Sequence, residues 1–179
     1  AAGGMGYVIA ELLGAGLLDG SAATVSGDSL ADYAREPLLS DNGLVWRDAP
    51  LASLDTDILR PVGDPHAPNG GLRMLDGNLG KAVIKISAVA EERRLIEAPA
   101  AVFEDEAAVK AAYAAGELDR DVVVVVRGQG PQATGMPELH SLTPMLSNLQ
   151  EKGHAVALVT DGRMSGASGT VPAAIHVMP

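Results

Sequence analysis

The feature that most limits the fold of this chain is a succession of short apolar runs in its second half. Val122–Val126 consists of consecutive valines, and Ala155–Val159 is a second aliphatic run. Runs of this length without alternating polar residues are typical of strands buried on both faces of a parallel sheet. Segments with helical features lie at Glu104–Ala115 and Pro137–Lys152. Alternating strands and helices predict an α/β domain.

Terminus signals support these assignments. Glu104–Ala115 has acidic residues in its first turn and Gly116 just beyond its last, as expected from the helix dipole and from glycine's tolerance of a left-handed C-terminal residue. Pro144 predicts a break in the second helical segment, and Gly153 predicts its end. Two further strands are expected, at Gly80–Val89 and at Val171–Val177.

The first part of the chain has a different pattern. Met5–Leu18 has apolar residues at helical spacing, and a serine or aspartate within 26–29 is placed to cap a short helix over 30–34. Residues 36–69 contain five prolines and an Asp-Asn-Gly turn signal, with one strand-like stretch at 44–46. We expect 1–35 to end one domain, 36–69 to be an extended connection and 70–179 to be a second domain. The alternative for 36–69 is a long irregular loop on a single domain.

Composition excludes several classes of function. The net charge of −10 and the aromatic content of 3% oppose binding to nucleic acid, which favours basic surfaces and stacking side chains. The longest aliphatic run is far shorter than the roughly 20 residues of a membrane span. The chain has no cysteine, so it can form neither a disulfide nor a thiolate metal site.

The two ends indicate excision from a longer protein. Ala1-Ala2-Gly3-Gly4 has neither an initiator methionine nor a signal-peptide pattern, and Val177-Met178-Pro179 directly follows an apolar segment. A trimmed, independent domain is the alternative.

Two glycine-rich segments follow the two buried strands and are the candidate site loops. In the first, residues 127–138, Pro137 is expected to open a helix whose N-terminus favours an anion. Glu138 would then be either a partner of the helix dipole or an oxygen ligand for a hard cation such as Mg²⁺.

The second segment, residues 160–169, lies where ligands gather in α/β sheets, beyond the carboxyl end of a strand. Ser165 or Ser168 is a nucleophile, a base or a turn residue, and a serine base needs a nearby metal or dipoles to lower its pKa. The sequence has no phosphate-binding P-loop, no dinucleotide fingerprint and no G-x-S-x-G elbow. The four histidines lack metal-ligand spacing, and no triad partner for a serine is evident.

These two segments carry a family resemblance. Residues 126–140 (VRGQGPQATGMPELH) and 159–177 (VTDGRMSGASGTVPAAIHV) resemble the dihydroxy-acid and 6-phosphogluconate dehydratase family, and most of all its members that act on 6-phosphogluconate. Supporting stretches make the resemblance nearly chain-long: they lie at 1–6, 43–48, 54–61 and 77–89.

The resemblance implies a cytoplasmic hydro-lyase, dimeric at full length and without nucleic-acid or membrane partners. Such an enzyme converts 6-phosphogluconate to 2-keto-3-deoxy-6-phosphogluconate in the Entner–Doudoroff pathway. A large N-terminal domain would hold an iron–sulfur cluster, of the 4Fe–4S type, on three cysteines that this chain lacks. The C-terminal domain would be a swivelling β/β/α domain built round a small barrel, incomplete here at its end. The chain alone is then expected to be inactive.

The resemblance also implies roles for individual residues. Glu138 matches the family's metal-ligand glutamate, with Mg²⁺ or a similar cation, and Ser165 matches its proposed catalytic base. Gly166, Arg163 and Ser168 are expected to bind the substrate.

Phosphate contacts are less defined. Arg163 and Arg127 are the candidates, and Arg163 has a scaffold pairing with Asp161 as its alternative. Relatives tend to have a basic residue after the proline of the first segment, where this chain has Gln132, which weakens the case for a phosphate contact there. Two other readings remain open: a dehydratase of another sugar acid or dihydroxy acid, and a non-catalytic binding domain.

Overall fold

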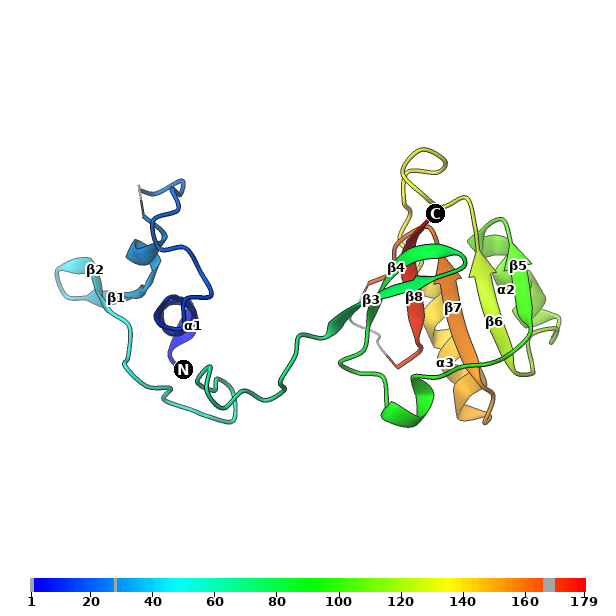
Figure 1. Ribbon diagram of the computed structural model, residues 1–179, viewed down its shortest axis with the longest axis horizontal. Helices are drawn as coiled ribbons and strands as arrows, with labels where there is room; N and C mark the ends of the chain where they lie inside the picture. Colours follow the sequence, from blue (N-terminus) through cyan, green and yellow to red (C-terminus); the bar gives the residue numbers. More distant parts are fainter. Residues whose placement is uncertain (1, 28, 166–169) are drawn as a thin grey trace. The chain divides into compact units, whose positions relative to one another are not determined.

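The computed structural model describes residues 2–27, 29–165 and 170–179, and divides into two compact units, Ala1–Pro68 and Asn69–Pro179 (Figure 1). Across these described ranges, no helix has the length and apolar character needed to span a bilayer.

The described residues of the first unit form one α-helix, one 3₁₀ turn and a hairpin. The hydroxyl of Ser29 accepts a hydrogen bond from the N–H of Ala31 at 3.1 Å, which confirms a serine cap for the short helix. The hairpin pairs Ser40 with Gly43 across a two-residue turn, and Gly43 has a φ of 99°, a value that glycine adopts without steric cost. The elements are α1 (Gly4–Gly14), η1 (Leu30–Tyr33), β1 (Arg35–Ser40) and β2 (Gly43–Asp48).

This hairpin differs from the expectation for residues 36–69. We expected an extended connection with a single strand-like stretch, but β1 and β2 pair antiparallel over six residue pairs, and the compact unit continues to Pro68. Strand β1 was not recognised in the sequence because it contains Pro37, which is unfavourable inside a strand, next to charged residues. Only its partner has a visible β signal, at 44–46, and that strand is confirmed.

The second unit contains a six-stranded sheet in the order β3-β4-β8-β7-β6-β5. Strands β5 to β8 pair parallel, whereas β3 and β4 form an antiparallel hairpin on the β8 side. The expected α/β architecture with a mostly parallel sheet is therefore confirmed. The strands are β3 (Leu72–Gly77), β4 (Gly80–Lys85), β5 (Ala100–Phe103), β6 (Val122–Val126), β7 (Val156–Thr160) and β8 (Ala173–Met178).

The β3–β4 hairpin was predicted only in part. The expected strand at 80–89 ends at Lys85, and β3 was not anticipated, because Leu72–Gly77 lacks polar–apolar alternation. Gly80 has a φ of 102°, and a Cβ there would lie 2.2 Å from the carbonyl oxygen of Met178. Glycine at this position therefore allows the backbones of β4 and β8 to approach closely.

Helices α2 (Glu106–Ala114) and α3 (Thr143–Glu151) end close to the predicted residues, but α3 begins at Thr143 and not at the expected Pro137. The carboxylate of Asp105 caps α2 by accepting from the N–H of Ala108 at 2.8 Å. Gly116 and Gly153 follow α2 and α3 with φ values of 76° and 97°, the left-handed conformation that commonly ends a helix.

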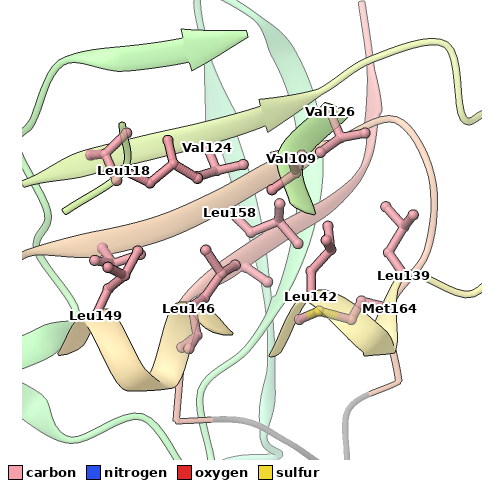
Figure 2. Packing of buried hydrophobic residues seen from close by; sticks show 14 of the residues in the cluster. Val109, Leu118, Val124, Val126, Leu139, Leu142, Leu146, Leu149, Leu158 and Met164 are labelled. Carbon is pink, nitrogen blue, oxygen red and sulfur yellow. The ribbon is translucent and has the colours of Figure 1, made fainter. Parts of the chain in front are cut away.

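The core of this unit lies between these helices and one face of the sheet (Figure 2). Val122, Val124 and Val126 are fully buried, while the intervening Val123 and Val125 are only half-buried. The prediction that β6 is buried on both faces was therefore wrong for one face, because α2 and α3 pack on the same side. Main contributors from the helical layer are Val109, Leu142, Leu146 and Leu149.

Candidate functional site

The two glycine-rich segments meet at one edge of the sheet. Strands β6 and β7 are parallel neighbours, with Val126 paired to Thr160 at their carboxyl ends, so the loops that follow leave the sheet side by side, as at other α/β ligand sites. Glu138 forms a parallel β-bridge with Arg163, and the N–H of Leu139 donates to the carbonyl of Arg163 at 3.3 Å. The expectation that both segments lie beyond strand ends is confirmed for their residues up to Ser165, the last described residue of the second segment.

The carboxylate of Glu138 holds the second segment in place. Its Oε1 accepts from the backbone N–H of Ser165 at 2.7 Å and from that of His140 at 3.1 Å. Its Oε2 lies 3.3 Å from the guanidinium of Arg163, which also donates from Nε to the carbonyl of Met136 at 2.8 Å. Charge-assisted bonds of this kind are stronger than neutral ones. The structure thus brings together three of the residues expected at the site.

The backbone around Glu138 was predicted wrongly. Pro137 was expected to open a helix, but a 3₁₀ turn, η3, begins only at His140 and runs to Leu142, and α3 begins at Thr143. Met136 adopts a left-handed φ of 56°, which directs the chain into the bridge with Arg163 instead of into a helix. Glu138 therefore precedes the first turn of η3, and its carboxylate accepts from the N–H of His140 at the start of that turn.

Asp161 holds the first loop in place, a role that was not predicted from the sequence. Its two carboxylate oxygens accept from the backbone N–H groups of Gln129 and Gly130, at 2.9 and 3.1 Å. The alternative that Asp161 pairs with Arg163 is not borne out, since Arg163 pairs with Glu138. An acidic residue directly after a buried strand and before glycine was the available signal.

Gly162 allows this clamp to close. A Cβ at Gly162 would lie 2.6 Å from the Cβ of Gln129, a separation that side chains do not tolerate. Gln129 is itself buried, and its Nε2 donates to the carbonyls of Glu104 and Arg127 at 2.8 and 3.1 Å. The first loop is therefore fixed from both sides.

Ser165 is half-buried and lines a small cavity of about 120 Å³. Leu72 and Lys85 of the β3–β4 hairpin and Met164 line the same cavity; the remaining lining residues are Val171, Ala173 and Ile175. Gly166 and Ser168, both expected to bind substrate, lie outside the described residues.

Arg127 forms its ion pair with Glu104 and not with Glu138, the partner of Arg163. Its guanidinium donates to the carboxylate of Glu104, with Nε and Oε1 at 2.8 Å. The hydrogen bonds from Arg127 hold the pKa of Glu104 below its usual value, and the carboxylate in turn raises the pKa of Arg127. Both side chains are exposed, so we assign this pair to loop support. Gln132 is exposed on the same loop.

The donor set does not fit a cation or a cluster held by this chain alone. Among the described residues, no group of three or more histidine, aspartate or glutamate side chains converges on a metal position. Glu138 offers a single carboxylate, and the guanidinium of Arg163 at its second oxygen opposes a second positive charge. An iron–sulfur cluster needs thiolates, and the chain contains no cysteine.

Comparison with known proteins identifies the family of this chain. A family model described as dihydroxy-acid/6-phosphogluconate dehydratase C-terminal matches residues 57–179. A phosphogluconate dehydratase of Pseudomonas aeruginosa is 59% identical over 179 residues, covering 100% of this chain and 29% of the relative. One from Zymomonas mobilis is 57% identical, covering 99% of this chain and 29% of the relative.

A more distant relative has a different name. A dihydroxy-acid dehydratase of Nitratidesulfovibrio vulgaris is 42% identical, covering 100% of this chain and 30% of the relative. The chain therefore spans about 30% of the length of these curated relatives. With the match over residues 57–179, these identities show that the chain belongs to the dihydroxy-acid/6-phosphogluconate dehydratase family.

Proposed function

We propose that this chain is the C-terminal catalytic part of a dehydratase that converts 6-phosphogluconate to 2-keto-3-deoxy-6-phosphogluconate. The observation that carries the proposal is the 2.7 Å hydrogen bond between Glu138 and the backbone of Ser165. It joins two residues that are 27 positions apart in the sequence, one from each family motif. Both lie beyond the carboxyl ends of parallel strands, where α/β sheets bind ligands. Two relatives named phosphogluconate dehydratase, at 59% and 57% identity, support the substrate.

In this proposal Ser165 is the base. As an alkoxide, its Oγ takes the proton from the carbon next to the substrate carboxylate and becomes a neutral hydroxyl, and the electron pair left behind forms a double bond to the neighbouring carbon. The hydroxyl on that neighbouring carbon departs and leaves as water, and the resulting enol becomes the 2-keto acid by proton transfer. The acid that assists the departing hydroxyl comes from outside this cysteine-free chain.

Glu138 and Arg163 are positioning residues in the structure as described. Glu138 fixes the backbone at Ser165, and Arg163 ties Glu138 to the loop carbonyl of Met136. The metal-ligand role of Glu138 remains a prediction that needs further ligands from other parts of the full-length protein. Substrate binding by Arg163, Gly166 and Ser168 also remains a prediction.

We also infer the wider context from the family. The second unit is the swivelling β/β/α domain, and its sheet with an antiparallel hairpin beside four parallel strands supports that assignment. The full-length protein is proposed to be a cytoplasmic homodimer whose partner is a small sugar-acid phosphate.

The test is a dehydration assay of the full-length protein that contains this chain, prepared anaerobically, with 6-phosphogluconate as substrate. We expect formation of a 2-keto product. Replacing Ser165 by alanine should lower kcat by about 10²- to 10⁴-fold, the usual contribution of a general base. Ser147→Ala, which removes a hydroxyl on α3 that lies 3.3 Å from that of Thr170, is the matched control and should retain activity.

No turnover by the wild type would refute the substrate assignment, and full activity of Ser165→Ala would refute the base. The isolated 179-residue chain is expected to be inactive, so turnover by this chain alone would refute the need for the missing part.

A second candidate function is dehydration of a dihydroxy acid. The relative from Nitratidesulfovibrio vulgaris that is named dihydroxy-acid dehydratase, at 42% identity, favours it. Assaying the full-length wild type with both substrates separates the two, because only an enzyme for 6-phosphogluconate should depend on the distal phosphate. Ligand binding without turnover of either substrate would instead support a non-catalytic binding domain.

A further inference from the structure

A cationic side chain lies in the cavity that Ser165 lines. The cavity has a volume of about 120 Å³ and is bounded by Lys85, Ser165 and five apolar residues. Of the described residues that line it, Lys85 alone carries a charge. The five apolar residues are Leu72, Met164, Val171, Ala173 and Ile175.

Strand register explains why Lys85 is directed to this place. Lys85 pairs with Leu72 across the β3–β4 hairpin, and Val83, two residues earlier on β4, pairs with Ile175 of β8. Because side chains alternate along a strand, Lys85 and Val83 lie on the same face of the sheet. Ile175 packs against the core beneath the helices, so this face is the one that carries α2, α3 and Met164.

The surroundings strengthen the effect of that charge. Lys85 and Ser165 are both half-buried, and the apolar lining lowers the local dielectric constant, so a charge acts there more strongly than in water. The chain has a net charge of −10, which disfavours an anionic substrate at long range. Binding an anion therefore needs local cations. Arg163 forms its ion pair with Glu138 and does not line the cavity, whereas Lys85 does.

The size of the cavity decides whether the carboxylate or the phosphate of the substrate lies close to Ser165 and Lys85. A six-carbon phosphorylated acid is too large for 120 Å³, so only the part of it nearest Ser165 can enter. The proton that Ser165 removes is on the carbon bonded to the carboxylate. The phosphate is at the other end of the carbon chain, several bonds away.

We propose that Lys85 is a further substrate-binding residue, which pairs with the carboxylate of the substrate beside Ser165. This inference rests on the proposed function. It assigns to a residue outside both family motifs a share in orienting the carbon from which the proton is taken.

The test uses the full-length protein with three variants. Lys85→Met keeps the length of the side chain and removes its charge, and it should raise KM for 6-phosphogluconate by about 10- to 100-fold, the loss typical of a hydrogen bond to a charged group. Lys85→Arg should restore much of the affinity. Lys81→Met is the matched control: Lys81 is exposed on the same strand and does not line the cavity, so its KM should stay at the wild-type value.

Competitive inhibitors identify the anion that Lys85 binds. Gluconate has the carboxylate without the phosphate, and glucitol 6-phosphate has the phosphate without the carboxylate. We expect Lys85→Met to weaken inhibition by gluconate about 10-fold or more and to leave inhibition by glucitol 6-phosphate unchanged. The reverse pattern would overturn the assignment to the carboxylate.

The possible failures can be distinguished. If the wild type does not dehydrate 6-phosphogluconate, the proposed function fails first. If the wild type is active and Lys85→Met has an unchanged KM and unchanged inhibition by gluconate, the role of Lys85 alone is refuted. If Lys85→Met and Lys85→Arg lose kcat equally with KM unchanged and a lowered melting temperature, Lys85 is structural, and the proposal is likewise overturned.

Discussion

The two compact units bury very different amounts of apolar surface. In the described part of Ala1–Pro68, the buried hydrophobic residues are Ala2, Tyr7 and Ala49, whereas the second unit has a continuous cluster between sheet and helices. The first unit also exposes large side chains, among them Leu39 at 82% and Trp46 at 52%. The difference teaches that hydrogen-bonded elements alone do not make a stable domain. A helix and a hairpin form in the first unit, but its core is too small to stabilise them by burial.

Separating the units is the most direct way to break this comparison. We expect residues 69–179 to fold alone and to unfold cooperatively, and residues 1–68 to have little protected structure, because conformational entropy outweighs the small buried surface there. Amide hydrogen exchange of the two fragments checks this. Cooperative unfolding of residues 1–68 would show that burial has been underestimated in the first unit.

Paired leucine substitutions sharpen the same contrast. Leu146 is fully buried on α3, so Leu146→Ala should lower the free energy of unfolding by about 2–5 kcal/mol through lost transfer energy and a residual cavity. Leu39→Ala, at an exposed position of the hairpin, should change it by less than about 0.5 kcal/mol. Denaturant titration of the 179-residue chain measures both values. A large effect at Leu39 would indicate that its side chain is covered in solution.

Glycine substitutions compare a packed loop with an open one. Gly162→Ala places a Cβ 2.6 Å from that of Gln129, and relieving this overlap should cost about 1–3 kcal/mol. Gly63→Ala in the first unit meets no atom within 4 Å and should be close to neutral. Thermal unfolding midpoints separate the two. If Gly162→Ala were neutral, the two site loops would not be in close contact.

The smallest expected effect is a pH dependence at the end of the second unit opposite the site loops. Asp119 accepts from Lys152 and His154, each at 2.8 Å, and these hydrogen bonds hold its pKa below the ordinary value of 3.8. A carboxyl group with a lowered pKa in the folded state stabilises the fold above its unfolded pKa, and loses that contribution as the pH falls through the folded value.

We therefore expect the melting temperature of the wild type to fall more steeply below about pH 4 than that of Asp119→Asn. Above that pH the two curves should run parallel. Parallel curves throughout would show that this exposed cluster contributes nothing measurable, as many surface ion pairs do.

The sequence predicted the parts of the fold whose signal is local. Strand β6 was predicted at its observed bounds because five consecutive valines, which are β-branched, strongly favour a strand. Gly116 and Gly153 marked helix ends through backbone chemistry that acts within a few residues, whereas Asp105, expected inside the first turn of its helix, is the N-cap of α2. Strands β1 and β3 were missed because their pairing partners supply most of the stabilisation and their own residues do not alternate.

The site residues also divide into those with a local sequence signal and those placed by distant parts of the chain. Glu138, Arg163 and Ser165 were identified from motifs, and the structure brings them together. The backbone at Glu138 was misjudged, because the left-handed Met136 and the bridge to Arg163 depend on a segment 25 residues away. Lys85 lies in the supporting stretch 77–89, but nothing in that stretch assigned it to the site, since only strand register places it at the cavity that Ser165 lines.

The bridge between Glu138 and Arg163 has a consequence for the order of folding. Its two residues come from loops that follow parallel neighbours, and parallel strands pair only after the intervening helical crossover has formed. Closing such a long loop is slow compared with forming a helix or a hairpin. The bonds around Ser165 should therefore be among the last native contacts to form during refolding. Regain of ligand binding would then report completion of the sheet rather than the earlier collapse of the chain.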